Sequence, residues 1–345
     1  MTRIPTGTTP NRDGKSWALG SAPWQDPPTP TTARARVIVD NDFSGDPDDL
    51  YQLVHHLLSP TVDIRAVIGS RLREGDPFDP GPASATHAVA VVQDIFARMG
   101  LRSAERIVQG SNQALQDRCT PQPSAAVDTV IAESLREDVD TPLFYVAGGG
   151  LTDLASAVLT EPRIAERLTV IWIGGNEHEG VALPPPDAMP IEYNLLIDPL
   201  AGQVVFNDSE LTLWQVPRDV YRQCLVSDSE LRRRVATTGS LGRHLYEETR
   251  AVMDHAAAAG AGPGETYALG DSPLVLLTAL QSLFEPDTTS SRHRNIPTPA
   301  IEDDGSYTAR ADARPMRLFT QVDTRLMFED MFLKLQEFDT WLSSS

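Results

Sequence analysis

The chain has 345 residues, with 29 lysines and arginines against 48 aspartates and glutamates, so its formal net charge is −19. A nucleic-acid-binding protein needs a basic surface that displaces condensed counterions, and so acidic a chain makes nucleic acid an unexpected partner. Hydrophobic residues make up 41% of the sequence and charged residues 22%, as in ordinary globular proteins and unlike disordered ones.

The first 35 residues are rich in Pro, Thr and Gly and lack periodicity. They predict an extended or disordered leader over residues 1–35, on which Trp17 and Trp24 indicate a docked part, followed by one folded domain over residues 36–345. No apolar run has the length of a signal peptide or a membrane span, so we expect no membrane partner. Cys119 and Cys224 can pair only once and fit no metal-binding spacing, which favours a soluble protein of the reducing cytoplasm.

From Arg36 onward short apolar runs alternate with longer helical patterns. The runs predict strands at Val37–Asp40, Arg65–Gly69, Leu143–Ala147, Thr169–Gly174, Leu211–Val216 and Arg317–Gln321. The longer patterns predict helices near residues 48–58, 84–99, 123–137, 151–159, 198–207, 229–259, 271–284 and 323–338. This alternation is typical of an α/β fold, open and Rossmann-like, with a mostly parallel central sheet and helices on both faces. Ligands of such folds bind beyond the carboxyl ends of the strands.

The first predicted strand runs into a loop that carries five aspartates within ten residues: Asp40, Asp42, Asp46, Asp48 and Asp49. A helix with a regular leucine and valine stripe follows. Helix capping explains three of the acids, with Asp46 as the N-cap before a proline and Asp48 and Asp49 at the positive end of the helix dipole.

Capping leaves Asp40 and Asp42 unexplained, because clustered carboxylates repel one another unless a cation lies among them. Hard oxygen donors without Cys or His favour Ca²⁺ or Mg²⁺ over zinc. The neighbouring His55 and His56 are expected on ordinary protein surface, and not as metal ligands.

Two other known motifs could account for the same aspartates. A calcium-binding EF-hand loop that starts at Asp40 requires a glutamate at its twelfth position, where Tyr51 stands, and a helix in front of it. The Asp-x-Asp pattern also resembles that of the haloacid dehalogenase-like phosphatases, which would make Asp40 a nucleophile and Asp42 an acid. That family uses a lysine further along the chain, whereas the only lysines here are Lys15 and Lys334. A phosphatase therefore stays the weaker alternative.

The loop Asp40-Asn-Asp42-Phe-Ser-Gly-Asp-Pro-Asp48-Asp49 also resembles the Asp-x-Asp-Pro-Gly-x-Asp-Asp signature of the inosine-uridine-preferring nucleoside hydrolases. Its extra length is similar to that in a divergent branch of the superfamily. Further segments resemble family segments in the same order: Ile64–Ser70, Val108–Asn112, Val146–Asp153, Ile171–Asn176, Glu192–Pro199 and Ala268–Pro273. The order and spacing of the segments are more specific than any one of them.

The resemblance implies a calcium-binding site and a sugar-binding site. The implied calcium ligands are Asp42, Asp49, Asp271 and the backbone carbonyl of Gly148, completed by water and two ribose hydroxyls. The implied sugar-binding residues are Asp48, Glu192, Asn194 and Asn176, with Asp40 as an acid that orients its neighbours. Asp42 would be the general base that activates the water.

The resemblance fails where the leaving base needs a proton, because Gly270 stands in place of the family's histidine. We expect His178 to supply the acid, with Trp172 and Tyr267 as further candidates. The implied function is a calcium-dependent N-glycoside hydrolase that cleaves a ribonucleoside or related ribosyl compound into sugar and base. The alternative is a calcium-dependent sugar-binding protein without turnover. The resemblance also implies a homo-oligomer, and it leaves the identity of the leaving base open.

Overall fold

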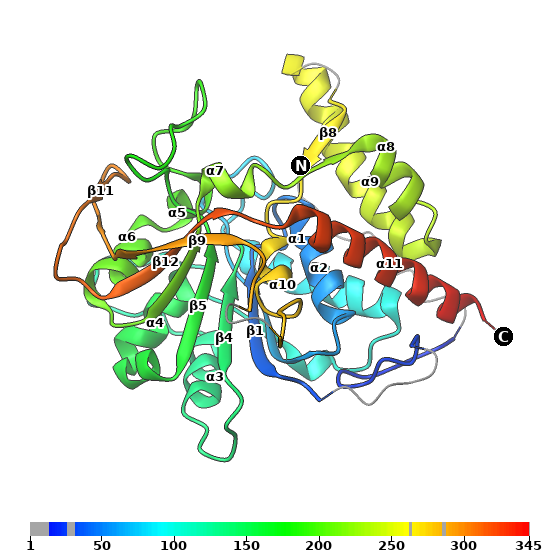
Figure 1. Ribbon diagram of the computed structural model, residues 1–345, viewed down its shortest axis with the longest axis horizontal. Coiled ribbons are helices and arrows are strands. Elements are labelled where there is room, and N and C mark those ends of the chain that lie inside the picture. Colours follow the sequence, from blue (N-terminus) through cyan, green and yellow to red (C-terminus); the bar gives the residue numbers. More distant parts are fainter. Residues whose placement is uncertain (1–13, 26–31, 262–263, 285–287, 345) are drawn as a thin grey trace.

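A single eight-stranded sheet runs through the centre of the molecule (Figure 1). The computed structural model describes residues 14–25, 32–261, 264–284 and 288–344. In spatial order the strands are β3 (Ile107–Gln109), β2 (Val62–Gly69), β1 (Ala35–Asn41), β4 (Leu143–Ala147), β5 (Leu168–Ile173), β6 (Thr212–Val216), β12 (Pro315–Gln321) and β9 (Arg292–Pro297). All neighbours are parallel except β9, which pairs antiparallel with β12.

Two small ribbons and a set of helices surround this sheet. The ribbons are β7 (Leu225–Ser227) with β8 (Thr266–Ala268), and β10 (Ala300–Ile301) with β11 (Tyr307–Thr308). The α-helices are α1 (Asp48–Leu57), α2 (Ser84–Met99), α3 (Ala125–Ser134), α4 (Thr152–Thr160), α5 (Tyr193–Ile197), α6 (Pro199–Gln203), α7 (Arg218–Tyr221), α8 (Asp228–Glu230), α9 (Gly239–Ala256), α10 (Pro273–Leu276) and α11 (Thr324–Ser343). Short 3₁₀ turns span Ala104–Arg106 and Pro162–Glu166, and π-helical turns span Val204–Asp208, Leu231–Val235 and Ala257–Ala261.

Both faces of the sheet are covered, so its strands bury side chains on each side. In β1 the buried Val37 and Val39 join a core that includes α1, α2, α9, α10 and α11, whereas Ile38 between them joins a core that includes α3, α4 and α6. Because successive side chains of a strand point to opposite faces, a strand covered on both sides is apolar throughout. The predicted α/β fold with a mostly parallel sheet is confirmed.

The six predicted strands all exist, and the structure adds strands that the sequence did not reveal. Strand β9 has the sequence Arg-His-Arg-Asn-Ile-Pro, and most of its side chains are exposed. At the edge of the sheet β9 pairs with only one strand and stays largely exposed, so its sequence has no apolar run. Strand β3 is only three residues long and none of them is fully buried.

Three predicted helices are shorter or broken. The helix expected over residues 229–259 is divided into α8, a π-helical turn and α9, and the break precedes Gly239, whose φ is +66°. The helix expected over 271–284 is reduced to α10; the buried run continues to Ala279, and beyond it Leu283 and Phe284 are 70% and 94% exposed. The helix expected over 198–207 starts at Pro199 and continues from α6 into a π-helical turn.

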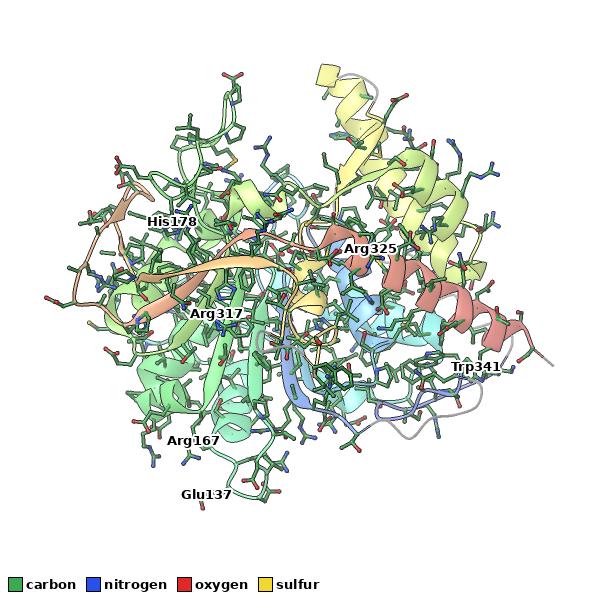
Figure 2. The ribbon with its side chains drawn as sticks, in the orientation of Figure 1. Glu137, Arg167, His178, Arg317, Arg325 and Trp341 are labelled. Atoms are coloured by element: carbon green, nitrogen blue, oxygen red, sulfur yellow. The ribbon has the colours of Figure 1, made fainter. Side chains whose placement is uncertain are left out.

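Part of the N-terminal segment packs on the folded domain. Trp17 is 2% exposed and donates from Nε1 to the carbonyl of Met99 at 2.9 Å. Trp24 lies 4.8 Å from the ring of Trp17 and 5.4 Å from that of Phe338 on α11, close to Trp341 (Figure 2). The rest of the predicted leader, 1–13 and 26–31, lies outside the described residues, and the division of the chain at residue 35 stays a prediction.

The strand order reverses between β1 and β4. From β1 the chain moves to β2 and β3 on one side, and then returns to place β4 on the other side of β1. In open α/β sheets such a switch point leaves a crevice at the carboxyl ends of the two strands, where ligands bind. Among the described residues, no helix is both long and apolar enough to cross a membrane.

Replacing Trp17 with alanine tests whether the N-terminal segment stabilises the domain. Trp17→Ala removes a buried aromatic side chain, so the free energy of unfolding should fall by about 3–5 kcal/mol. Denaturant unfolding followed by circular dichroism measures this change. The matched control is Leu183→Ala at a side chain that is 87% exposed, which should change stability by less than about 0.5 kcal/mol. Equal effects of the two variants would contradict a stabilising role of the segment.

Candidate active site

The acidic loop follows β1 at the switch point of the sheet. Asp40 is the penultimate residue of β1, and its carbonyl accepts a hydrogen bond from Gly148 N at 3.0 Å, directly after β4. The loop then turns tightly, with Gly45 N donating to the carbonyl of Asp42 at 2.6 Å. The strand register therefore brings the aspartates against the glycine-rich turn that follows β4.

Helix α1 begins with two acidic residues. Asp48 and Asp49 form its first turn, where the positive end of the helix dipole favours carboxylates. The predicted N-cap at Asp46 is wrong by one residue, because Pro47 holds that position and its ring has no side-chain acceptor. The Asp46 Oδ1 atom instead accepts a hydrogen bond from Asp48 N at 3.4 Å.

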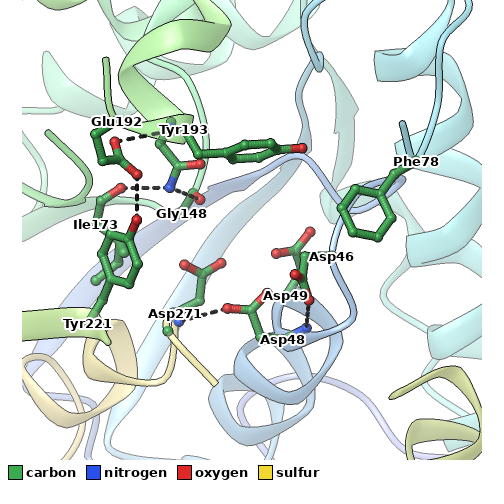
Figure 3. Close-up of a pocket in the computed structure, with 12 residues that line it drawn as sticks. Asp46, Asp48, Asp49, Phe78, Gly148, Ile173, Glu192, Tyr193, Tyr221 and Asp271 are labelled. Carbon is green, nitrogen blue, oxygen red and sulfur yellow. Dashed lines mark hydrogen bonds between the residues drawn. The ribbon is translucent and has the colours of Figure 1, made fainter. Parts of the chain in front are cut away.

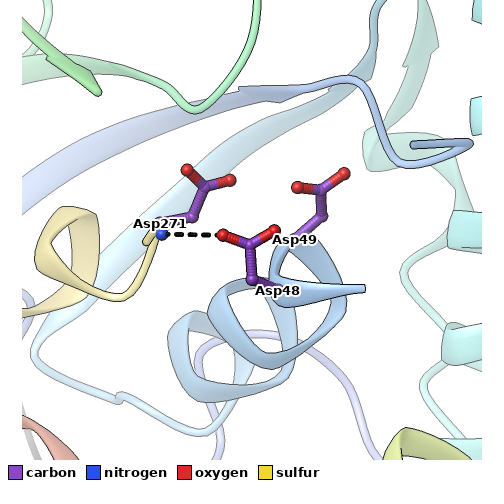
Figure 4. A group of neighbouring side chains, drawn as sticks. All are labelled: Asp48, Asp49 and Asp271. Atoms are coloured by element: carbon purple, nitrogen blue, oxygen red, sulfur yellow. Dashed lines mark hydrogen bonds between the residues drawn. The ribbon is translucent and has the colours of Figure 1, made fainter. Parts of the chain in front are cut away.

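A pocket of about 290 Å³ opens above these residues (Figure 3). The described residues that line it are Asp46, Asp48, Asp49, Phe78, Gly148, Ile173, Glu192, Tyr193, Asn194, Tyr221, Gly270 and Asp271. Asp48, Asp49 and Asp271 each offer a carboxylate oxygen, and these oxygens lie within 4.8 Å of one another (Figure 4). The N–H of Asp271 donates to Asp48 Oδ2 at 3.2 Å, which ties the late segment to α1.

Burial and mutual repulsion make this group of carboxylates hard to ionise. Burial, with the charge of Asp271, raises the pKa of Asp42 and of Asp48 well above the ordinary range. Burial, with the charge of Asp42, does the same for the pKa of Asp49. Burial raises the pKa of Asp271 to about 7, and burial with the charge of Asp153 raises the pKa of Asp40 to about 8.

The donor set fits a hard divalent cation. All side chains of the group are carboxylates, and Asp49 Oδ2 is buried without a hydrogen-bond partner among the described residues. No lysine, arginine or histidine is among the described residues that line the pocket, so no side chain there offsets the negative charge. A divalent cation would do so through oxygen ligands alone.

Glycine at position 148 is required by close packing. A Cβ atom there would lie 2.3 Å from Asp271 Oδ2 and 2.4 Å from Asn41 Nδ2. Asn41 Nδ2 donates to Asp271 Oδ2 at 2.6 Å and so holds this carboxylate against the glycine. No pattern in the sequence predicts this role for Asn41.

The prediction that His55 and His56 lie on ordinary surface is wrong. Both are buried, with exposed fractions of 1% and 0%, because α10 and α11 cover the outer side of α1. His55 Nε2 pairs with Asp330 at 2.7 Å, and His56 Nε2 bonds Thr278 Oγ1 at 2.9 Å. His56 Nδ1 contacts Gln52, which reaches toward Asn41, so a chain of buried polar side chains supports the acidic site from behind.

Glu192 and Asn194 lie on the pocket wall opposite the aspartates. Glu192 is fully buried, and its Oε2 atom accepts from the backbone N–H groups of Gly175, Asn194 and Leu195 at 2.7–3.1 Å. Its Oε1 atom accepts from the hydroxyl of Tyr221 at 2.8 Å. Asn194 Nδ2 donates to the carbonyls of Gly148 and Ile173 at 2.7 and 2.8 Å.

Other predicted site residues are not among the described residues that line the pocket. Asn176 is a brace, since its Oδ1 accepts from Glu192 N at 2.8 Å and its Nδ2 donates to the carbonyl of Pro190 at 2.6 Å. Asp40 accepts a hydrogen bond from the hydroxyl of Tyr145. Asp42 is 4% exposed and is not among the described lining residues, although a Cβ on Gly149 would lie 3.0 Å from its Oδ1.

The expected leaving-group acids are not brought to the described pocket wall. The ring of His178 (Figure 2) stacks on Tyr307 at 4.2 Å, and its Nε2 bonds Gln215 at 2.8 Å. Trp172 is fully buried and donates from Nε1 to the carbonyl of Gly149 at 3.0 Å. Tyr267 donates its hydroxyl hydrogen to Asp46.

Three aromatic side chains in the wall were missed. Phe78, Tyr193 and Tyr221 come from a loop, from α5 and from the end of α7, and they line the pocket together with the acids (Figure 3). In the sequence Tyr193 lies between the predicted site residues Glu192 and Asn194, and these two neighbours could have indicated it. Phe78 and Tyr221 have no motif around them, and only the fold brings them here.

The comparisons with known proteins agree with this α/β fold and its acidic pocket. A family model for the inosine-uridine preferring nucleoside hydrolases matches residues 37–328, so the chain belongs to this family. It is 40% identical over 134 residues to the inosine-uridine preferring nucleoside hydrolase of Crithidia fasciculata, across 38% of each chain. It is 38% identical over 96 residues to that of Leishmania major, across 28% of each chain. These alignments therefore cover well under two thirds of the curated relatives.

Solved structures show the same fold over most of the chain. A purine-preferring ribonucleoside hydrolase from Gardnerella vaginalis is similar with a TM-score of 0.66 and 15% identity, over 88% of this chain and 99% of that one. A plant nucleoside hydrolase is similar with a TM-score of 0.64 and 18% identity over the same shares. At such low identity the likeness shows the fold alone.

The raised pKa values predict how pH affects the metal-free protein. Asp271 and Asp40 have folded pKa values of about 7 and 8 against an ordinary 3.8, so the folded state binds more protons than the unfolded state between these limits. Stability should therefore fall as the pH rises from about 4 to 8. Thermal unfolding in chelator measures this, and Ca²⁺ should restore more stability at pH 8 than at pH 5. A melting temperature that rises from pH 5 to 8 in chelator would contradict the account.

A second prediction concerns the glycine beside Asp271. Gly148→Ala puts a methyl group where Asp271 Oδ2 and Asn41 Nδ2 lie, so it should displace the carboxylate and weaken Ca²⁺ binding by at least about tenfold, or about 1.4 kcal/mol. Calorimetric titration measures the affinity. The control is Gly81→Ala, whose Cβ has its nearest neighbour at 3.8 Å. Equal affinities of both variants and the wild type would show that the close approach does not matter.

Proposed function

We propose that this protein is a cation-dependent N-glycoside hydrolase that cleaves ribonucleosides, or related ribosyl compounds, into free sugar and base. The observation that carries the proposal is the buried carboxylate group of Asp48, Asp49 and Asp271 in a pocket that Glu192 and Asn194 complete. Membership of the nucleoside hydrolase family supports the same reaction class. The pocket lies at the switch point of the sheet, where ligands of such folds bind.

The proposed cation is calcium, held by Asp42, Asp49, Asp271 and the carbonyl of Gly148. Three of these four residues line the pocket, and the oxygen donors suit a hard cation. When bound, such an ion holds sugar hydroxyls and lowers the pKa of a water molecule. Asp48 belongs to the same carboxylate group, its Oδ2 accepts from Asp271 N, and its side chain is proposed to bind a sugar hydroxyl.

The hydrogen-bonding capacity of the opposite wall supports sugar binding. Asn194 uses both Nδ2 hydrogens on carbonyls, which leaves its Oδ1 to accept from a hydroxyl. Glu192 has three donors on Oε2 and one on Oε1, so Oε1 keeps an acceptor position. Asn176 is proposed to act by bracing Glu192 rather than by touching the sugar.

The chemical step we propose uses Asp42 as the general base. It takes a proton from the attacking water as the oxygen bonds to the anomeric carbon. Positive charge develops on the sugar in an oxocarbenium-like transition state, and the surrounding carboxylates stabilise it. Asp40, buried behind Asp42 and bonded by Tyr145, is proposed to keep the neighbouring acids in position. The role of His178 as acid stays a prediction, since its ring packs on Tyr307 behind the wall.

The other candidate functions have less support. A calcium-dependent sugar-binding protein without turnover is favoured only by the missing acid at Gly270. A phosphatase needs a cation for the phosphate, and both lysines lie elsewhere: Lys15 bonds Ser344 Oγ at 2.7 Å and Lys334 bonds Asp330 at 2.5 Å.

Location and assembly also belong to the proposal. We propose a cytoplasmic protein, which the unpaired thiols of Cys119 and Cys224 support. We also propose that the protein is a homo-oligomer, and this proposal rests on the resemblance to the family alone. Helix α11 buries most of its apolar residues within the chain itself, although Leu333 on it is 51% exposed.

Sugar release from purine and pyrimidine ribonucleosides tests the proposed activity. Asp42→Asn keeps the size of the side chain but removes the base, so turnover should fall by about 10³-fold while the fold is retained. The control Asp128→Asn, on an exposed residue of α3, should turn over like the wild type. An unchanged rate in Asp42→Asn would remove Asp42 from the mechanism. Tight Ca²⁺ binding without cleavage of any ribosyl compound would favour the sugar-binding alternative.

A further inference from the structure

Apart from its carboxyl groups, the described wall of the pocket offers no acid for a departing base. Five carboxylates line it, and its described wall has no histidine, lysine, arginine or cysteine. A neutral nucleoside releases its base as an anion unless a proton arrives in the transition state, and a positioned acid contributes about 10²–10⁴-fold to such a step. The position beside Asp271 that could carry an acid is Gly270, which has no side chain.

The two tyrosine hydroxyls of the pocket wall are poor substitutes for such an acid. Tyr221 donates its hydroxyl hydrogen to Glu192 Oε1 at 2.8 Å, and Tyr193 donates its own to Asp76 Oδ2 at 2.8 Å. Burial and the nearby carboxylates raise the pKa of both hydroxyls further above the ordinary value for tyrosine. Each hydrogen is thus engaged by a carboxyl oxygen and is harder to transfer than that of a free phenol.

The same wall suits a positively charged ring. One divalent cation offsets two of the five lining carboxylate charges, so the pocket stays anionic when all five are ionised. Phe78, Tyr193 and Tyr221 line the same pocket (Figure 3), and aromatic faces attract cations. Charge and aromatic surface together favour a flat, cationic heterocycle over a neutral one.

Building on the proposed function, we propose that the preferred substrates are ribosides whose leaving group is already a cationic heteroaromatic ring, such as a pyridinium or an N7-alkylated purinium. Water oxygen bonds to the anomeric carbon and its proton goes to Asp42. The C–N bond breaks with its electron pair passing to the ring nitrogen, which neutralises the ring. The products are free ribose, a neutral heterocycle and one proton, and no acid is needed for the base.

The sharpest test compares two substrates that differ by one methyl group and one charge. The ratio of kcat/KM for N7-methylguanosine to that for guanosine is measured on the calcium-loaded protein. The expected ratio is at least about 10², because the neutral base needs the contribution of an acid and the cationic ring does not. Nicotinamide riboside should also be cleaved. A ratio near one, with both purine ribosides cleaved, would overturn this proposal and leave the proposed function intact.

A binding measurement separates the two proposals further. The cation 1-methylnicotinamide should bind the calcium-loaded protein at least about tenfold more tightly than neutral nicotinamide, and the preference should weaken with salt. Equal affinities would contradict the cationic preference. If no riboside, charged or neutral, is cleaved while calcium binds, the proposed hydrolase function fails and this inference fails with it.

Discussion

The structure depends on one electrostatic constraint, the burial of several carboxylates beside one another at the carboxyl ends of β1 and β4. Asp42, Asp48, Asp49 and Asp271 are each at least 90% buried or line the pocket, and burial, with repulsion from nearby carboxylates, raises the pKa of their carboxyl groups. Such an arrangement is costly without a counter-charge, and the pocket wall that the structure describes has no basic side chain. The divalent cation that we propose would relieve this repulsion.

The surrounding fold is adapted to this constraint. Parallel pairing of β1 with β4 puts Gly148 against the acidic loop, and the absence of a side chain there makes room for Asp271 and Asn41. The first turn of α1 supplies a partial positive charge to Asp48 and Asp49. Behind it, Gln52 and His56 fill the interior with paired polar groups, so the amide of Asn41 is held in place from both sides.

The sequence predicted the sheet and the acidic loop because both depend on local patterns. Apolar runs report buried parallel strands, and Asp40, Asp42, Asp48 and Asp49 lie on a strand end and a helix start that are adjacent in the chain. Asp271 and Glu192 are distant in the chain, so only the order of family-like segments placed them in the same site. His55 and His56 were misplaced because a histidine carries no signal for the helices that later cover it.

Features that depend on tertiary contacts could not be predicted from the sequence. Phe78 and Tyr221 belong to a loop and a one-turn helix without a motif, and they reach the pocket only because distant segments meet there. The edge strand β9 is mostly exposed and polar, so it carries no apolar pattern. The same limit applies to the expected acid: its absence at Gly270 was visible, whereas the hydrogen bonds that occupy His178, Tyr193 and Tyr221 were not.

The buried carboxylates are proposed to hold a cation that the cleavage of an N-glycoside requires. The most direct test of this proposal is a stoichiometric reactivation, in which protein dialysed against chelator receives Ca²⁺ in fractions of one ion per chain while sugar release is measured. Sugar release should be absent at the start, rise in proportion to the ion added, and level off at one ion per chain. Undiminished release by the metal-free protein would contradict the account.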